Sequence, residues 1–270
     1  MRGQWREIAR ACKRVALGNG RIRVLDREFT VAYDARGAWQ ENDYPILQRL
    51  ATTHRCIWDV GAHKGITALI MATAMPAGRL YAIEASEYAA NIIRANASLN
   101  GLTDRIEVVN ALVDERSGAT MDFYWDSASV YASVLPNREE PGRRVEPLRK
   151  ATLSLDDFAS APDRSPDFVK IDVEGAEGRV LRGMQNTLRH ARPLAFVEVH
   201  RLSDKSVGDH AVSLLPFVQA VGYRMIALRT KREVTDAESL AGYASRVHVL
   251  LLPVERQLPE GLTSLDTSSL

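Results

Sequence analysis

The stretch DVGAHKG, residues 59–65, decides the fold of this chain. It follows a short apolar run at 56–58 and precedes a helix-like run at 66–75, so it stands where a strand turns into a helix. Gly61 permits a tight turn, and Gly65 lets the helix begin close against the strand. The free amides of the first helical turn can then meet a polar or anionic group. The stretch therefore predicts a ligand-binding turn.

Apolar runs alternate with helical stretches from residue 56 onward. The expected strands lie at residues 56–60, 80–84, 106–110, 168–172, 194–200, 223–228 and 246–252. The expected helices lie at residues 66–75, 87–100, 176–191 and 207–221. This alternation is typical of an α/β fold with a largely parallel sheet. The last two strands are joined by a segment with little helical period, which favours an antiparallel return at the sheet edge.

Three parts are expected along the chain. Residues 1–50 form an extension with a basic amphipathic helix and a hairpin, and residues 51–254 form the α/β domain. Within that domain, the proline-rich stretch 126–150 is expected to be a long loop that covers the substrate. Residues 255–270 are polar and Ser/Thr-rich, which predicts a disordered tail. The basic helix could bind a membrane surface, but docking on its own domain or on a second copy of the chain is the preferred interpretation.

Composition excludes several classes of protein. The 270 residues carry a formal net charge of only +1, so no global field recruits nucleic acid. No apolar run approaches the roughly 18 residues of a membrane span, and the N-terminus lacks the apolar core of a signal peptide. The two cysteines, Cys12 and Cys56, are too few for a disulfide framework. A cytoplasmic location is expected.

Two acidic residues end the first two expected strands. Asp59 ends the first, and Glu84 ends the second, about 20 residues past the turn, where a ribose-binding acid belongs. A carboxylate can accept two hydrogen bonds from a vicinal diol. The glycine spacing is G-x-x-x-G, which matches neither the dinucleotide fingerprint nor the P-loop. The pattern predicts an adenosine-type ligand that is not a typical dinucleotide.

A second acidic group follows a later strand. In FVKIDVEGAEGRVLRGM, residues 168–184, an apolar strand ends at Asp172, and Glu174 and Glu177 follow. So many carboxylates would repel a pyrophosphate but not a sulfonium with an amino-acid tail. This favours S-adenosylmethionine over NAD or ATP.

The motifs together resemble a known family. The segments IWDVGAHKG, YAIEAS, IEVVNALV, TLSLDDF, FVKIDVEGAEGRVLRGM and LAFVEVH occur in the order expected for the FkbM family of S-adenosylmethionine-dependent methyltransferases. Many members methylate hydroxyls of sugars or natural products. The resemblance implies a Rossmann-like class I methyltransferase fold, with a seven-stranded, mostly parallel sheet whose last strand is antiparallel. His63 departs from the family, in which asparagine is more usual.

The resemblance also implies a set of cofactor-binding residues at the ends of the strands. They are Asp59, Gly61, Ala62, Gly65, Glu84, Ala85, Ser86, Asn110, Ala111 and Asp172. The turn would hold the methionine part, Glu84 the ribose hydroxyls, and Asn110 with its neighbours the adenine. Asp172 would lie near the transferred methyl group and the acceptor.

An alcohol acceptor must lose its proton, and three residues are candidates for this chemistry. They are His200, whose ordinary pKa of about 6.5 suits a base at neutral pH, and Asp172 and Glu174. Glu198 lies two residues before His200 and so on the same face of the strand. Asp172, Glu198 and His200 could instead bind Mg²⁺. Glu177 is expected to be a first-turn residue favoured by the helix dipole rather than a reactive group.

The sequence thus predicts an O-methyltransferase that acts on a small molecule, preferably a sugar or a glycosylated natural product. Tyr124, Trp125 and Tyr131, beside the 126–150 loop, could stack on a sugar ring. Two alternatives stay open: an NAD(P)-dependent oxidoreductase, and a catalytically inactive methyltransferase-like binding module. No nucleic-acid partner is expected, and the N-terminal helix could join copies of the chain into a homo-oligomer.

Overall fold

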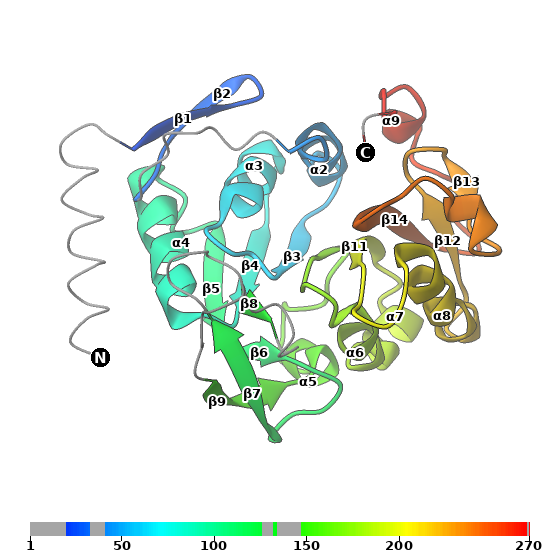
Figure 1. Cartoon of the computed structure of the whole chain (residues 1–270). Helices are drawn as coiled ribbons and strands as arrows, with labels where there is room; N and C mark the ends of the chain where they lie inside the picture. The colour runs from blue at the N-terminus through cyan, green and yellow to red at the C-terminus, as the bar shows by residue number, and fades with distance from the viewer. Residues whose placement is uncertain (1–19, 33–40, 126–131, 134–146, 269) are drawn as a thin grey trace. The chain divides into compact units, whose positions relative to one another are not determined.

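The computed structural model describes residues 20–32, 41–125, 132–133, 147–268 and 270 (Figure 1). The N-terminal helix expected within residues 1–20, and most of the 126–150 loop with Tyr131, lie outside these residues. The chain divides into two compact units, residues 1–110 and 111–270. The boundaries expected at residues 50 and 254 stay predictions.

The first unit is built on three parallel strands. They run side by side in the order β3 (Cys56–Val60), β4 (Arg79–Glu84) and β5 (Ile106–Asn110). The crossovers are α3 (Ile66–Ala74) and α4 (Glu87–Leu99). Ile57, Trp58 and Leu80 are fully buried, as expected for strands covered on both faces. These elements confirm the expected ones to within a residue at each end.

A hairpin and a short helix complete this unit. The hairpin pairs β1 (Arg21–Val24) with β2 (Arg27–Thr30) through a two-residue turn, as expected for residues 21–34 as far as they are described. Helix α2 (Tyr44–Ala51) was not expected. It has proline in its first turn and buries Tyr44, Leu47 and Leu50.

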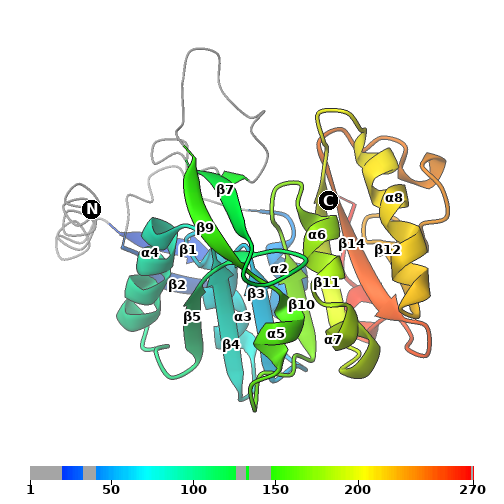
Figure 2. The ribbon, with the colours of Figure 1, turned by 90° about the horizontal axis from the view of Figure 1, so that it is seen from below.

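The second unit contains the later strands. They lie in the order β10 (Phe168–Ile171), β11 (Leu194–His200), β14 (Arg246–Pro253), β12 (Tyr223–Ala227) and β13 (Arg232–Glu233). β10 and β11 are parallel, whereas β14 runs antiparallel to both of its neighbours. The antiparallel return of the last long strand is confirmed; a total of seven strands stays a prediction. Helix α8 (Val207–Ala220) lies along β12 and β14 (Figure 2), and the 3₁₀ turn Glu238–Leu240 precedes β14.

The helix expected at 176–191 is interrupted. The chain forms α6 (Glu177–Arg182) and α7 (Gln185–His190), with Gly183 between them. A Cβ atom on Gly183 would lie 2.2 Å from the carbonyl oxygen of Asp114. This close backbone approach requires a glycine and marks the place where the helix breaks.

The expected long loop contains sheet structure. A smaller sheet has the order β6 (Leu112–Val113), β9 (Leu148–Leu153), β7 (Thr120–Trp125) and β8 (Ala132–Ser133). Figure 2 shows β7 and β9 side by side. Residues 126–150 were expected to form one long loop. This is wrong for residues 132–133, which form β8, and for residues 148–150, which begin β9. Helix α5 (Leu155–Ala159) follows this sheet.

The C-terminal segment is structured where it is described, contrary to the expected disorder. Helix α9 (Glu260–Thr263) buries Leu262, and the Lys231 ammonium donates hydrogen bonds to the carbonyls of Thr263 and Leu265 at 3.0 and 2.7 Å. The burial of Leu262 and the hydrogen bonds from Lys231 explain why this polar segment is ordered. Among the described residues, no helix combines the length and apolar character needed to cross a membrane.

Candidate active site

The turn after β3 has the backbone conformation that its glycines predict. Gly61 and Gly65 have φ angles of +77° and +81°, in the left-handed region. The Gly61 amide donates to the carbonyl of Ile83 at 2.9 Å, and the Gly65 amide to that of Ala62 at 2.8 Å. A Cβ atom on Gly65 would lie 3.0 Å from the Ile93 side chain. The turn is thus compact and packs closely against α4.

Glu84, at the end of β4, is fixed to this turn. It is 6% exposed. Its Oε2 accepts a hydrogen bond from the His63 amide at 2.8 Å, and its Oε1 accepts one from the Ser86 amide at 2.7 Å. A carboxylate can accept hydrogen bonds from both hydroxyls of a vicinal diol. The buried and fixed carboxylate of Glu84 is therefore compatible with a ribose diol.

The end of β5 supports the loop that follows Glu84. The Asn110 amide group donates to the carbonyls of Glu84 and Ala85 at 2.8 and 3.1 Å. The Ser86 hydroxyl accepts from the Ala89 amide and so caps α4. Asn110 and Ser86 therefore hold the loop in shape. Ala111, half-buried, is the first residue of the second unit.

Two further side chains steady the turn, and neither was predicted from the sequence. The Thr67 hydroxyl donates to Oδ2 of the buried Asp59 at 2.6 Å. Asn96, fully buried on α4, donates to the Lys64 carbonyl and accepts from the Ala32 amide, both at 2.7 Å. The sequence does place Asn96 on the apolar face of the helix expected at 87–100. A buried amide needs hydrogen-bond partners, so this position could have indicated a structural role.

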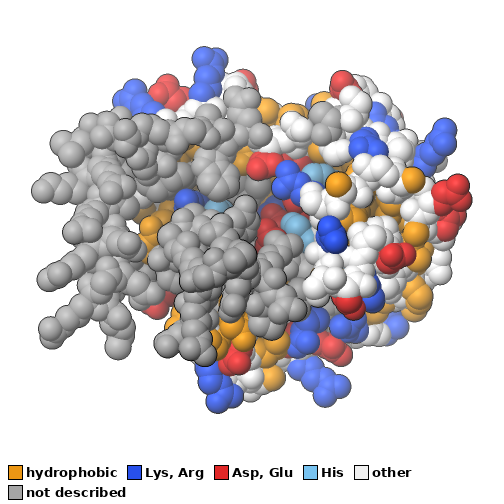
Figure 3. Space-filling model, viewed as in Figure 1, with side chains coloured by type: hydrophobic (Ala, Val, Ile, Leu, Met, Phe, Trp, Pro, Cys, Tyr) orange, Lys and Arg blue, Asp and Glu red, His pale blue; other side chains and the backbone are white. Residues whose placement is uncertain are grey.

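The second unit brings the other candidate residues together around His200. Since β10 and β11 are parallel neighbours, their carboxyl ends meet at one edge, and His200 ends β11. We name Asp172, Glu174, Glu177, Glu198 and His200 the acidic–histidine centre. Figure 3 shows acidic and histidine side chains gathered in the region where Figure 1 labels β11.

Four carboxylates surround the His200 ring. Nδ1 lies 2.8 Å from Oε1 of Glu177. Nε2 lies 3.3 Å from Glu198, 3.7 Å from Glu174 and 3.8 Å from Asp172. The expected grouping of His200 with Asp172, Glu174 and Glu198 is therefore present. Glu177 lies in the first turn of α6, as expected, and it is also fully buried against the ring.

This environment changes the charge of the histidine. Burial lowers the pKa of His200, but hydrogen bonds to Glu177 and Glu198 and the charge of Glu174 outweigh it and raise the pKa to about 10. The ring is then an imidazolium at neutral pH, contrary to the neutral base expected from its ordinary pKa. Burial raises the pKa of Glu198, while hydrogen bonds from His200 and His248 lower it by more.

Basic residues contact two of the carboxylates of the acidic–histidine centre. The buried Lys170 ammonium donates to Oδ2 of Asp172 at 3.1 Å. Arg246 and His248 on β14 lie 3.1 and 3.2 Å from the two oxygens of Glu198. These supporting residues were not predicted from the sequence. Arg246 and His248 are two residues apart on β14 and so lie on one face of the strand. Only the antiparallel pairing of β14 with β11 shows that this face is the one that carries Glu198 and His200.

The backbone after β10 has a rare conformation. Glu174 has a φ of +54° and Gly175 a φ of +102°. The Gly175 amide donates to Oε1 of Glu177 at 2.9 Å. A non-glycine residue in the left-handed region costs about 1–2 kcal/mol, and such residues concentrate at functional sites. The turn returns Glu174 toward His200.

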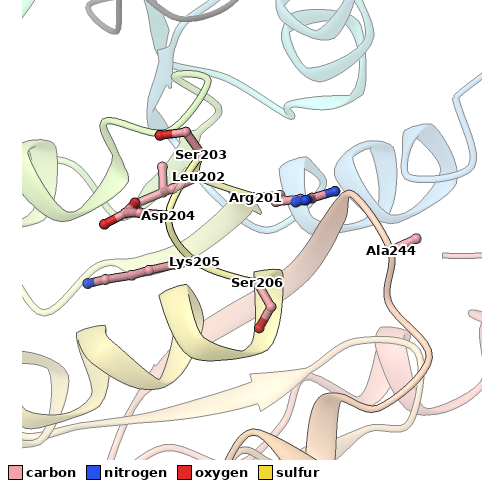
Figure 4. Close-up of a pocket in the computed structure, with 7 residues that line it drawn as sticks. All are labelled: Arg201, Leu202, Ser203, Asp204, Lys205, Ser206 and Ala244. Carbon is pink, nitrogen blue, oxygen red and sulfur yellow. The ribbon is translucent and has the colours of Figure 1, made fainter.

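A cavity of about 430 Å³ lies directly after β11. Figure 4 shows its lining, with the 201–206 loop on one side and Ala244 on a separate segment. The lining residues are Arg201, Leu202, Ser203, Asp204, Lys205, Ser206 and Ala244. Polar side chains predominate, which suits a hydroxylated molecule. Because the cavity begins at the residue after His200, it adjoins the acidic–histidine centre along the chain.

An α/β fold with a glycine turn and an acid at the end of the next strand is compatible with a Rossmann-like class I methyltransferase. Residues 59–225 match the family model described as the methyltransferase FkbM domain, which is more than half of the chain. The chain therefore belongs to the FkbM methyltransferase family.

Comparison with solved structures gives similarities at low sequence identity. The FkbM methyltransferase from Methylobacillus flagellatus aligns with a TM-score of 0.44 and 14% identity, over 72% of this chain and 43% of that one. This chain therefore spans less than half of that protein. The O-methyltransferase from Bacillus cereus, in complex with SAH, aligns with a TM-score of 0.47 and 16% identity, over 91% and 90%.

A third structure is the O-methyltransferase of tomaymycin synthesis from Streptomyces achromogenes, in complex with SAM. It aligns with a TM-score of 0.45 and 15% identity, over 92% of this chain and 89% of that one. These structural similarities add no weight to the family assignment, which stands on the family model. The comparison with curated proteins gave no significant match.

Family membership confirms the resemblance drawn from the motifs. It confirms the class of S-adenosylmethionine-dependent methyltransferase in place of the oxidoreductase alternative. The roles of the individual cofactor-binding and catalytic residues stay predictions.

Proposed function

We propose that this chain transfers a methyl group from S-adenosylmethionine to a hydroxyl of a small molecule, with a sugar or a glycosylated natural product as the preferred acceptor. The observation that carries the proposal is the acidic–histidine centre at the end of β11. A neutral amine attacks a methyl group without prior loss of a proton, whereas a hydroxyl needs a base. A centre rich in carboxylates therefore favours an oxygen acceptor.

The cofactor is assigned to the first unit. Glu84 accepts hydrogen bonds from the ribose hydroxyls, because a carboxylate held in place by the His63 and Ser86 amides matches a vicinal diol. The turn, with Asp59, Gly61, Ala62 and Gly65, accommodates the methionine part. Asn110 keeps the loop after Glu84 in place. When bound, the sulfonium supplies an electrophilic methyl group.

The acceptor is assigned to the second unit. Asp172 and His200 are 3.8 Å apart, so one acceptor oxygen can contact both. Asp172 takes the hydroxyl proton, and the imidazolium of His200 stabilises the negative charge that develops on the oxygen. Glu174 holds a neighbouring hydroxyl. Glu177 keeps the ring in position through Nδ1.

The reaction balances with these groups. The acceptor oxygen forms a bond to the methyl carbon as the carbon–sulfur bond breaks, and the sulfur retains the electron pair. The proton goes to Asp172, and the products are a methyl ether and S-adenosylhomocysteine. Alignment of the reacting atoms supplies several kcal/mol of the rate enhancement.

Turnover with methyl-labelled cofactor tests this function. We expect label in a new O-methyl group on at least one member of a glycoside panel and none in a panel of primary amines. His200→Asn should lower kcat by about 100-fold or more. His190→Asn, an exposed histidine on α7, is the matched control and should leave kcat unchanged. Label in amines alone would contradict the proposal.

A further inference from the structure

Three ligand-type atoms converge in the acidic–histidine centre. His200 Nε2, one oxygen of Asp172 and one of Glu174 all lie within 4.8 Å of one another. Nε2 is 3.8 Å from Asp172 Oδ1 and 3.7 Å from Glu174 Oε2, too far for hydrogen bonds. Bonds of roughly 2.1 Å to a shared cation place neighbouring ligand atoms roughly 3.0–3.5 Å apart. Small side-chain rotations would therefore complete a coordination sphere.

A second observation concerns the residues that hold two of the three ligands, His200 and Asp172, in place. His200 Nδ1 is bound by Glu177, which is fully buried, and no hydrogen bond to Oε2 of Glu177 is found within the described part of the chain. A carboxylate on the far nitrogen is the usual support of a metal-binding histidine, because it fixes the tautomer and the ring orientation. On the other ligand, the buried Lys170 holds the far oxygen of Asp172. Glu177 thus holds His200, and Lys170 holds Asp172. The remaining atoms of this pair, His200 Nε2 and Asp172 Oδ1, face each other.

The surroundings of His200 also limit which groups can compete for Nε2. Glu198, 3.3 Å away, is the group that competes, because it accepts a hydrogen bond from the protonated ring while its two oxygens also contact Arg246 and His248. Asp172 and Glu174 are partly exposed, with side-chain exposures of 28% and 26%. The three-atom face is therefore reachable from solvent, whereas its supports are buried.

We propose that Asp172, Glu174 and His200 Nε2 bind one divalent cation. A set of two carboxylates and one imidazole suits Mn²⁺ or Zn²⁺ better than Mg²⁺, which prefers oxygen ligands and retained water. The site stands on these residues alone. Binding displaces the proton from Nε2, so the ring is neutral while the ion is bound. The use of the ion, which rests on the proposed function, is to orient two hydroxyls of the acceptor and to supply, in place of the imidazolium, the positive charge beside the reacting oxygen.

The test is Mn²⁺ binding to the full chain, without S-adenosylmethionine or acceptor. After chelator treatment and dialysis, Mn²⁺ is titrated while the electron paramagnetic resonance signal of the free ion is recorded. We expect one bound ion per chain. Glu174→Gln and Asp172→Asn should each weaken binding by at least about 10-fold, and Glu177→Gln by about 10- to 100-fold. Zn²⁺ should compete for the site, and Mg²⁺ should compete only weakly.

The control variant is Glu233→Gln, an exposed carboxylate of the same unit paired at the surface with Arg224. It should bind Mn²⁺ like the wild type. Circular dichroism establishes that each variant is folded, and the partly exposed Glu174 gives a substitution with little effect on folding. Absence of binding up to millimolar Mn²⁺ would overturn the proposal, as would equal binding by the Asp172→Asn/Glu174→Gln double variant. S-adenosylmethionine binding measured with chelator present tests the proposed function separately.

Discussion

The buried carboxylate of Glu177 holds Nδ1 of His200 at 2.8 Å, and this contact fixes the ring that ends β11. Glu177 belongs to the first turn of α6 and His200 to the end of a strand, so the bond ties a helix start to a sheet edge. The same carboxylate accepts the Gly175 amide and thereby shapes the turn that carries Glu174.

Glu177→Gln should therefore impair catalysis without altering affinity for the cofactor. The amide keeps the shape but loses the charge, and a small misplacement of a catalytic group can cost about 100-fold in rate. We expect kcat to fall by about 10- to 100-fold with S-adenosylmethionine affinity unchanged. Steady-state kinetics and calorimetry on the same preparation check this. An equal loss of cofactor affinity would indicate a general structural defect instead.

The protonation of His200 gives a second prediction. The groups that face the ring are Asp172, Glu174, Glu177, Glu198 and, beyond Glu198, Arg246 and His248. With chelator present, NMR should show the His200 imidazole protonated throughout pH 6–8, since its pKa is raised to about 10. Assignment comes from comparison with His200→Asn. A midpoint near the ordinary value of about 6.5 would contradict this account.

The sign of the linked stability follows from the raised pKa. The folded state binds the proton more tightly than the unfolded state, so this contribution is fully present below about pH 6.5. It is lost as the pH rises from there toward about 10. Urea unfolding at a series of pH values should show the wild type losing more stability over this window than His200→Asn. Parallel curves would be the contrary result.

Gly65→Ala should destabilise the protein and weaken cofactor binding. Alanine at a φ of +81° costs about 1–2 kcal/mol, and its Cβ would meet Ile93 at 3.0 Å. Gly118→Ala is the matched control, because Gly118 has a φ of +80° and a Cβ atom on it would have no described atom within 4 Å. Urea unfolding should show the larger loss for Gly65→Ala. Equal losses of unfolding free energy in the two variants would mean that the close contact between Gly65 and Ile93 of α4 does not contribute to stability.

Asn96→Ala should be costly because the side chain serves two buried backbone groups. It loses the bonds to the Lys64 carbonyl and the Ala32 amide, and each unsatisfied group costs about 1–3 kcal/mol. We expect the free energy of unfolding to fall by about 2 kcal/mol or more. Asn91→Ala, on the same helix, removes an acceptor of the surface Arg94 and should change it by about 0.5 kcal/mol or less. A small effect at Asn96 would show that the hairpin and the turn are not coupled.

Sequence reasoning predicted those features that depend on local pattern. β11 is an apolar run interrupted only by Glu198 and ended by His200, and it was placed at its observed bounds. The positive φ angles of Gly61 and Gly65 follow from a strand meeting a helix within a few residues. Asp172, Glu174 and His200 were grouped correctly, because the carboxyl ends of parallel strands share an edge.

The features that were missed depend on contacts between distant segments. The break at Gly183 reflects the carbonyl of Asp114, which no local pattern reveals. Glu177 looked like an ordinary first-turn acid until β11 placed His200 against it. The charge of His200 depends on the carboxylates of Glu177, Glu198 and Glu174, so its ordinary pKa was the wrong guide. Arg246 and His248 required the register of β14 on β11.

Calorimetric titration of S-adenosylmethionine tests the central claim most directly. We expect micromolar binding to the wild type, and a loss of at least about 10-fold for Glu84→Ala, because hydrogen bonds to a charged acceptor contribute about 1.5–3 kcal/mol each. Glu107→Ala, which removes a surface carboxylate paired with Arg79 on the neighbouring strand, should bind like the wild type. NAD should give no heat. Absence of S-adenosylmethionine binding by folded protein, or unchanged binding by Glu84→Ala, would contradict the account.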